Sequence, residues 1–209
     1  AKGFNKIAKK LSKIIANKEK ISEQKLNFLS AQILQKHGEL GLSFVPITAF
    51  NANAAKAHAL PEQIIAKKGD LFLLDAGIRY QRYCSDRTRT LELSQKMQMS
   101  KTQKFKDSKK NEIYQIVLQA QQAAINAVKP GVLACDIDAK ARSVIQKAGY
   151  GKNFFHSTGH GVGLDIHELP RINQSSTEIL KEGMVFSIEP GIYFEGEFGV
   201  RIEDVVVVT

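Results

Sequence analysis

The chain has 209 residues, a hydrophobic fraction of 43% and a formal net charge of +9. This length and composition suit one globular domain and exclude general disorder. The longest strongly apolar runs, such as 205–208, are far too short to cross a bilayer, and the chain opens with no secretion leader. Two cysteines are too few for a disulfide framework. We therefore expect a cytoplasmic protein without a membrane partner.

Much of the positive charge lies in two lysine-rich stretches, 2–20 and 96–110. A surface that binds nucleic acid would interleave such lysines with arginine and stacking aromatic residues. Phe105 is the one aromatic residue in the second stretch. We interpret both stretches as solvated surface and expect no nucleic-acid partner, with polyanion binding as the alternative.

The spacing of apolar residues, helix caps and turn residues predicts a mixture of helices and hairpins. In chain order these are helices at 6–15 and 22–37 (N-cap Ser22), a strand at 43–50, a loop with His58, hairpin strands at 71–79 and 83–93, an exposed polar loop at 94–110, helices at 112–128 and 136–148, a glycine-rich stretch at 159–163, and a second hairpin of 184–189 with 199–208. Two hairpins, each associated with helices, indicate an α+β fold with two similar halves.

Two aspartates of the first hairpin are symmetric about the midpoint between positions 80 and 81. A two-residue turn there places Asp75 directly opposite Asp86, with Cβ atoms about 4.5–5.5 Å apart. Asp75 also continues the apolar face of its strand, which is unusual for a solvent residue. The alternative is that these acids are ordinary ion-pair partners of Arg87 or Arg89.

The second hairpin repeats this arrangement. Glu189 and Glu203 are symmetric about Gly196, a residue suited to a hairpin loop. Carboxylates that face each other on a sheet repel unless a positive charge lies between them. Four such carboxylates carry a formal charge of −4, which two divalent cations would neutralise. The two hairpins therefore predict a metal site.

Histidine placement supports this prediction. His156, His160 and His167 lie within a twelve-residue span, and glycines surround His160. Glycines allow the backbone to approach a ligand closely. An oxygen-rich set of ligands with one imidazole suits Mn²⁺ or Co²⁺ at least as well as Zn²⁺. We expect Mn²⁺, with Co²⁺ or Zn²⁺ as the alternatives.

Five motifs together resemble the pita-bread metallopeptidases, the family of methionine aminopeptidase, aminopeptidase P, prolidase and creatinase. They are Asp-Ala-Gly at 75–77, Ser-Asp-Arg-Thr-Arg-Thr at 85–90, His-Gly-Val-Gly-Leu-Asp-Ile-His-Glu at 160–168, Ile-Glu-Pro-Gly-Ile-Tyr at 188–193 and Gly-Val-Arg-Ile-Glu-Asp at 199–204. The second motif and the short loop between the two glutamates are similar to the aminopeptidase P and prolidase branch. The resemblance implies a curved, mainly antiparallel sheet with helices on its outer face and two pseudo-symmetric halves.

The resemblance also implies a role for each site residue. Asp75 would hold one metal ion, His160 and Glu189 the other, and Asp86 and Glu203 would bridge both. A water or hydroxide between the ions would be the nucleophile, and Glu189 would also move a proton to the leaving amine. His58 and His167 would lie near the reacting peptide, and His156 would line the pocket. Tyr193 and Arg201 would orient the ligands. For Arg201 the alternative is a simple ion-pair partner of Asp204 or Glu203.

The function implied is hydrolysis of the Xaa-Pro bond at the N-terminus of a peptide or in a dipeptide. We expect one catalytic domain over 1–209 without the family's separate N-terminal domain, and a homodimer for the full-length protein. Asn51 stands where relatives commonly have glycine, which is tolerable because asparagine adopts positive φ. The alternatives are an inactive module that binds protein or nucleic acid, and an enzyme for a non-proline substrate, resembling methionine aminopeptidase or creatinase.

Overall fold

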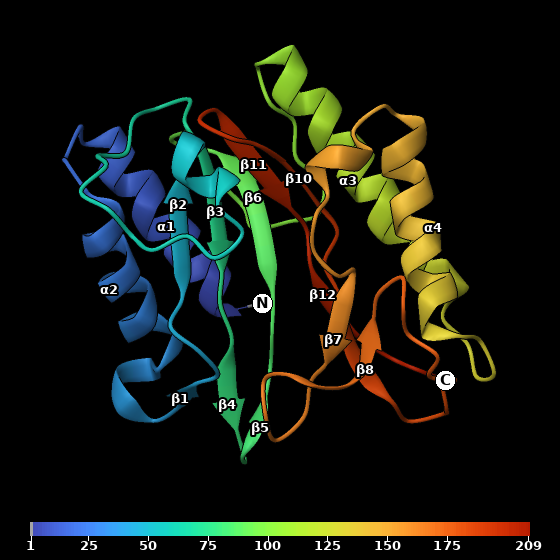
Figure 1. Ribbon diagram of the computed structural model, residues 1–209. Helices are drawn as coiled ribbons and strands as arrows, with labels where there is room; N and C mark the ends of the chain where they lie inside the picture. Colours follow the sequence, from blue (N-terminus) through green and yellow to red (C-terminus); the bar gives the residue numbers. More distant parts are fainter. Residues whose placement is uncertain (1) are drawn as a thin grey trace.

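Two pairs of helices flank a central set of strands (Figure 1). The computed structural model describes residues 2–209. Helices α1 and α2 lie on one side of the strands, and α3 and α4 lie on the other. Their bounds are α1 (Lys2–Ala16), α2 (Glu23–Leu34), α3 (Ser108–Ala127) and α4 (Ala134–Lys147), with short 3₁₀ helices at η1 (Lys36–Gly38), η2 (Asn51–Ala55) and η3 (Gly151–Asn153). Within the described chain, no helix combines the length and the apolar content of a membrane span.

The strands pair antiparallel throughout, in four small sheets with the orders β1-β4-β5, β2-β3-β6, β10-β11 and β12-β9-β7-β8. Their bounds are β1 (Gly41–Leu42), β2 (Ile47–Phe50), β3 (Leu71–Asp75), β4 (Ile78–Tyr80), β5 (Tyr83–Cys84), β6 (Thr88–Glu92), β7 (Gly159–Gly161), β8 (Glu168–Ile172), β9 (Val185–Ile188), β10 (Gly191–Phe194), β11 (Phe198–Arg201) and β12 (Asp204–Val207). The predicted α+β class is confirmed.

Strand β3 is buried on both faces, and this positions its last residue. Leu71 and Leu73 belong to the apolar core that includes residues of α3 and α4, whereas Phe72 and Leu74 belong to the core that includes residues of α1 and α2. Because side chains alternate along a strand, Asp75 follows Leu71 and Leu73 toward the centre of the molecule. An acid at this place cannot reach bulk water easily.

The two halves of the chain meet along β6 and β11. The Thr90 hydroxyl lies 2.9 Å from the carbonyl oxygen and 3.2 Å from the amide nitrogen of Arg201. The amide of Glu203 donates to the carbonyl oxygen of Thr88 at 3.2 Å. The acids predicted from each hairpin are therefore brought to one seam.

The predicted helices are confirmed, with shifted ends. Ser22 caps α2, since its hydroxyl accepts from the amide of Lys25. Helix α3 begins at Ser108, earlier than predicted, after the N-cap Asp107. The prediction of an exposed loop at 94–110 is partly wrong, because Met99 and Phe105 are buried. The burial of these two residues was not predicted because the segment around them is mostly polar.

The glycine-rich stretch is a strand, which the sequence did not predict. In β7, a Cβ on Gly159 would lie 1.8 Å from the carbonyl oxygen of Ser187, and one on Gly161 would lie 2.2 Å from that of Leu169. Glycine is required here because neighbouring backbone approaches too closely for any side chain. His160 is thereby held inside a sheet.

The predicted register of the first hairpin is wrong, and that of the second is confirmed. Asp75 pairs with Thr88, because the turn is at Gln81 and Arg82, which both have positive φ. This centre is one position later than predicted, so Asp86 lies two positions from Thr88, on the same strand face, rather than directly opposite Asp75. In the second hairpin, Ile188 pairs with Asp204 and Gly191 with Arg201, as symmetry about Gly196 requires.

Candidate metal centre

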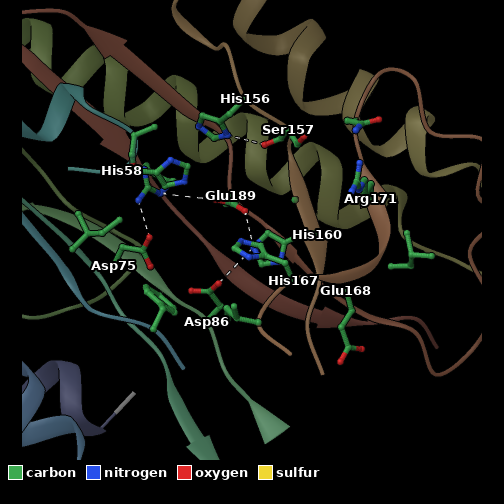
Figure 2. A pocket seen from close by; sticks show the side chains of 18 residues that line it. His58, Asp75, Asp86, His156, Ser157, His160, His167, Glu168, Arg171 and Glu189 are labelled. Carbon is green, nitrogen blue, oxygen red and sulfur yellow. Dashed lines mark hydrogen bonds and ion pairs between the residues drawn. The ribbon is translucent and has the colours of Figure 1, made fainter. Parts of the chain in front are cut away.

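The five predicted metal ligands lie in or beside different strands at the seam between the halves: Asp86, His160 and Glu203 form one cluster, Glu189 contacts His160, and Asp75 contacts Arg201. Asp75 ends β3, Asp86 lies between β5 and β6, His160 is in β7, Glu189 follows β9 and Glu203 lies between β11 and β12. Ligand atoms of Asp86, His160 and Glu203 all lie within 4.8 Å of one another. His160 Nε2 lies 3.3 Å from Glu189 Oε1 and 3.6 Å from Asp86 Oδ2. Figure 2 shows Asp86, Glu189 and His160 directed toward one another.

Unpartnered oxygens show that this donor set fits a cation. Oδ1 of Asp75, Oδ1 of Asp86 and Oε1 of Glu203 are buried without a hydrogen-bond partner among the described residues. A buried carboxylate oxygen without a donor or a cation costs free energy. His160 Nδ1 lies 3.0 Å from the carbonyl oxygen of Gly161. If Nδ1 carries the proton, Nε2 is left with a lone pair for a metal ion.

Burial shifts the ionisation of these acids. Burial, together with the charges of Asp75 and Glu189, raises the pKa of Asp86 to about 8. The pKa of Glu203 is well above its usual value, mainly because the side chain is buried and then because of neighbouring acids. For Glu189, burial opposes ionisation, but the hydrogen bond with His160 and nearby positive charges outweigh it and lower the pKa. The cluster therefore has more carboxylates than the side chains around it can stabilise as anions.

Arg201 supports the centre from within the protein. Its guanidinium donates to Asp75 Oδ2 at 2.8 Å and to the Tyr193 hydroxyl at 2.9 Å. That hydroxyl also lies 2.8 Å from His156 Nε2. The alternative in which Arg201 pairs with Asp204 or Glu203 is wrong, because the ion pairs of Arg201 within residues 2–209 are with Asp75 and, at 4.0 Å, with Glu189. Arg201 contacts a predicted ligand and orients it.

Replacement of Arg201 by methionine is expected to destabilise the metal-free protein by about 3 kcal/mol, because it leaves the buried Asp75 without a counter-charge. Tyr193→Phe, which removes one hydroxyl from the same chain of contacts, is expected to cost about 1 kcal/mol. Urea unfolding of both variants measures the difference. A smaller loss for Arg201→Met than for Tyr193→Phe would show that Arg201 does not stabilise Asp75.

Arg87 and Arg89 test the alternative in which Asp75 and Asp86 are ordinary ion-pair partners. Arg89 is buried and donates to Asp204, and Arg87 lies 3.9 Å from Asp204. Among the described residues, neither arginine forms an ion pair with Asp75 or Asp86. The alternative is therefore wrong.

A pocket of about 590 Å³ opens above the centre. The three predicted histidines outside the metal set, His58, His156 and His167, all line it. The rings of His160 and His167 are 4.2 Å apart between centroids. Burial and then the neighbouring His160 lower the pKa of His167. Four of the five predicted ligands, all except Glu203, thus line the same cavity as these three histidines.

Three further pocket or centre residues did not come from the sequence argument. The Thr88 hydroxyl donates to Glu203 Oε2 at 2.6 Å, and that of Ser187 donates to Glu189 Oε1 at 3.1 Å. Thr88 lies two residues beyond Asp86 and Ser187 two residues before Glu189, so strand alternation was the available signal. Arg171 lies in β8, a strand that was not predicted, and it lines the pocket on the far side of His160 from Asp75 (Figure 2).

The fold and the acid-rich centre define the class of a candidate metal-dependent hydrolase. The chain belongs to metallopeptidase family M24, whose model matches residues 1–209. The resemblance to the pita-bread metallopeptidases and the pita-bread fold are therefore confirmed.

Relatives of this chain include proline peptidases. It is 43% identical over 177 residues to the Xaa-Pro dipeptidase of Pyrococcus furiosus, which covers 85% of the chain and 48% of that relative. The solved prolidase of Pyrococcus furiosus has a TM-score of 0.81 at 38% identity, covering 99% of the chain and 59% of that structure. An X-Pro aminopeptidase from Thermotoga maritima has a TM-score of 0.82 at 33% identity, covering 99% and 56%. The chain spans about half the length of the curated relatives that it matches.

Proposed function

We propose that this chain is the catalytic part of a peptidase that hydrolyses Xaa-Pro bonds with two divalent metal ions. One observation carries the proposal: among residues 2–209, Asp75, Asp86 and Glu203 each have a buried carboxylate oxygen without a hydrogen-bond partner, and Asp86 and Glu203 cluster with His160 beside a pocket lined by further histidines. The names of the relatives support the substrate class. An inactive module would be expected to lose ligands, whereas all five are present here.

The proposed ligands are Asp75, Asp86, His160, Glu189 and Glu203, with Asp86 and Glu203 shared by the two ions. Bound ions would lower the pKa of a water molecule and polarise the scissile carbonyl. We take Mn²⁺ as the expected ion because four of the five ligands offer oxygen.

We assign the proton transfer to Glu189. Its carboxylate lies at the pocket and contacts both His160 and the Ser187 hydroxyl, at 3.3 Å and 3.1 Å. In the proposed reaction it accepts a proton from the attacking water and passes it to the leaving amine. His58 and His167 are exposed in the same pocket and can donate to the substrate carbonyl.

Proline as the leaving residue suits this cavity. An Xaa-Pro bond has no N–H on the proline nitrogen, so peptidases that require that donor fail there. Apolar Ile47 and Leu169 line the pocket beside the polar groups. Arg171, also in the lining, has a guanidinium without an ion-pair partner among residues 2–209. This cation could receive the carboxylate of a dipeptide.

We expect the Mn²⁺-loaded protein to cleave Gly-Pro faster than Arg-Pro-Pro, because the guanidinium of Arg171 would bind a substrate carboxylate close to the scissile bond. Arg171→Ala should reduce kcat/KM for Gly-Pro by about 10-fold or more and change that for Arg-Pro-Pro little, since a charge-assisted contact contributes about 1.5–3 kcal/mol. Product release measured by chromatography tests this. Cleavage of neither peptide by folded protein with two metal ions would defeat the proline-specific function.

We extend the proposal to the whole molecule in four respects. Residues 1–209 form one catalytic domain, the full-length protein is a homodimer, it works in the cytoplasm, and it needs no nucleic-acid partner. Size-exclusion chromatography with light scattering tests the homodimer.

A further inference from the structure

A single buried carboxylate holds both ends of the loop that carries His58. Glu23 is the first residue of α2 and is fully buried, at 0% exposed. Its carboxylate accepts from the amide of Phe50 at 2.6 Å, from Asn53 Nδ2 at 2.7 Å and from the amide of Glu62 at 2.8 Å. Two of these donors precede His58 in the chain and one follows it. The carboxylate therefore closes the loop between them.

The backbone of Glu23 fixes the same carboxylate to its surroundings. Its amide donates to the carbonyl oxygen of Ile64 at 3.1 Å, and its carbonyl oxygen accepts from the Thr48 hydroxyl at 3.1 Å. Thr48 belongs to β2. A carboxylate in the first turn of a helix is also favoured by the helix dipole. Glu23 therefore connects α2, β2 and the loop rigidly.

The ring of His58 has no comparable support of its own. Among the described residues, no hydrogen bond is formed by its ring nitrogens, although the ring lines the pocket. The contacts nearby are made by the loop backbone: Arg201 donates to the carbonyl oxygen of Ala57 at 3.2 Å, and Asn53 Nδ2 donates to that of Leu60 at 2.9 Å. Figure 2 shows the His58 ring directed into the cavity on the side of Asp75. The loop therefore determines where the imidazole lies.

We propose that Glu23 is a positioning residue for the hydrolysis: it contacts neither substrate nor metal and acts by holding the His58 loop against the pocket. This inference rests on the proposed function, in which His58 contacts the reacting peptide. Among residues 2–209 the Glu23 carboxylate forms no ion pair, and the donors that it meets are two backbone amides and one side-chain amide.

Glu23→Gln tests the role with little change in shape. Phe50 donates to one carboxylate oxygen, while Asn53 and Glu62 donate to the other. A glutamine has one acceptor oxygen, so its amide nitrogen must face at least one of these donors. We expect kcat for Gly-Pro to fall about 10- to 100-fold, as for a catalytic group displaced by about 1 Å, with two metal ions still bound. The double variant with His58→Ala should be no slower than His58→Ala alone.

Proteolysis gives a readout that does not require activity. Lys56 lies in the loop, so trypsin cleavage after Lys56 reports loop release. We expect Glu23→Gln to increase the rate of this cleavage at least about 10-fold, as the loop opens locally. The control is Leu26→Ala, which weakens the buried face of the same helix but keeps the carboxylate. It should retain wild-type kcat at temperatures where it is folded.

The kinetic and proteolysis experiments distinguish failure of the proposed peptidase function from failure of the inference about Glu23. If the wild-type protein cleaves no Xaa-Pro peptide, the proposed function fails, while protection of Lys56 still decides whether Glu23 holds the loop. Equal cleavage after Lys56 in wild type and Glu23→Gln would overturn the inference. So would losses of kcat in Glu23→Gln and His58→Ala that multiply in the double variant, since the two residues would then act independently.

Discussion

Asp86→Ala is expected to lower turnover of Gly-Pro about 1000-fold and to reduce bound Mn²⁺ from two ions per chain to one or none. Asp86 lies 3.6 Å from His160 Nε2 and within the cluster formed with Glu203, and in the proposed function its carboxylate is shared between the two ions. Loss of one shared ligand removes several kcal/mol of charge stabilisation in the transition state, and about 4 kcal/mol corresponds to this rate change. Metal analysis and peptide hydrolysis measure the two effects.

The control for this experiment is Asp136→Ala. Asp136 is an exposed acid in the first turn of α4 and does not line the pocket. It should keep both ions and wild-type turnover, which separates loss of a ligand from loss of one negative charge. Full metal content and full activity in Asp86→Ala would exclude Asp86 from the centre.

His160→Ala and His167→Ala are expected to fail in different ways although their rings are only 4.2 Å apart. His160 is in the ligand cluster and its Nε2 faces Glu189 and Asp86. His160→Ala should therefore bind fewer metal ions and, as a result, turn over substrate more slowly. His167 lines the pocket beyond the cluster, so its removal should leave both ions in place and lower kcat by about 100-fold, the scale of one lost general acid–base or oxyanion contact.

Metal analysis after dialysis, followed by kinetics at saturating Mn²⁺, distinguishes these outcomes. Saturating metal should restore His160→Ala in part, because the remaining acids still attract the ion. It should not restore His167→Ala. Equal metal loss in both variants would show that the two roles have been assigned wrongly.

The candidate site could be predicted from the sequence because the face of a strand on which a residue lies depends only on whether its position is odd or even. The first hairpin turns at Gln81 and Arg82, one position later than predicted, so Asp75 faces Thr88 rather than Asp86. This error changes the register by two residues, which keeps both aspartates on the same face of the strands. An error of one residue would have placed Asp86 on the opposite face.

The remaining features depend on contacts between distant segments, which local patterns do not encode. The glycine-rich stretch at 159–163 was assigned no helix or strand from the sequence, because the need for glycine arises from the backbone of Ser187 and of Leu169, which comes so close that a strand fits there only without side chains. The partner of Arg201 was likewise open, since Asp204 and Glu203 are its neighbours in sequence whereas Asp75 is its neighbour in space. Asn51 was correctly expected at positive φ, and it has a φ of 41°.

A crystal of the Mn²⁺-loaded protein, measured at the manganese absorption edge, tests whether acids from both hairpins surround a pair of ions. We predict two anomalous peaks about 3.5–4 Å apart, with carboxylate oxygens of Asp86 and Glu203 reaching both and His160 reaching one. A single peak, or two peaks outside the space between β3, β7 and the segment at 202–203, would contradict the account.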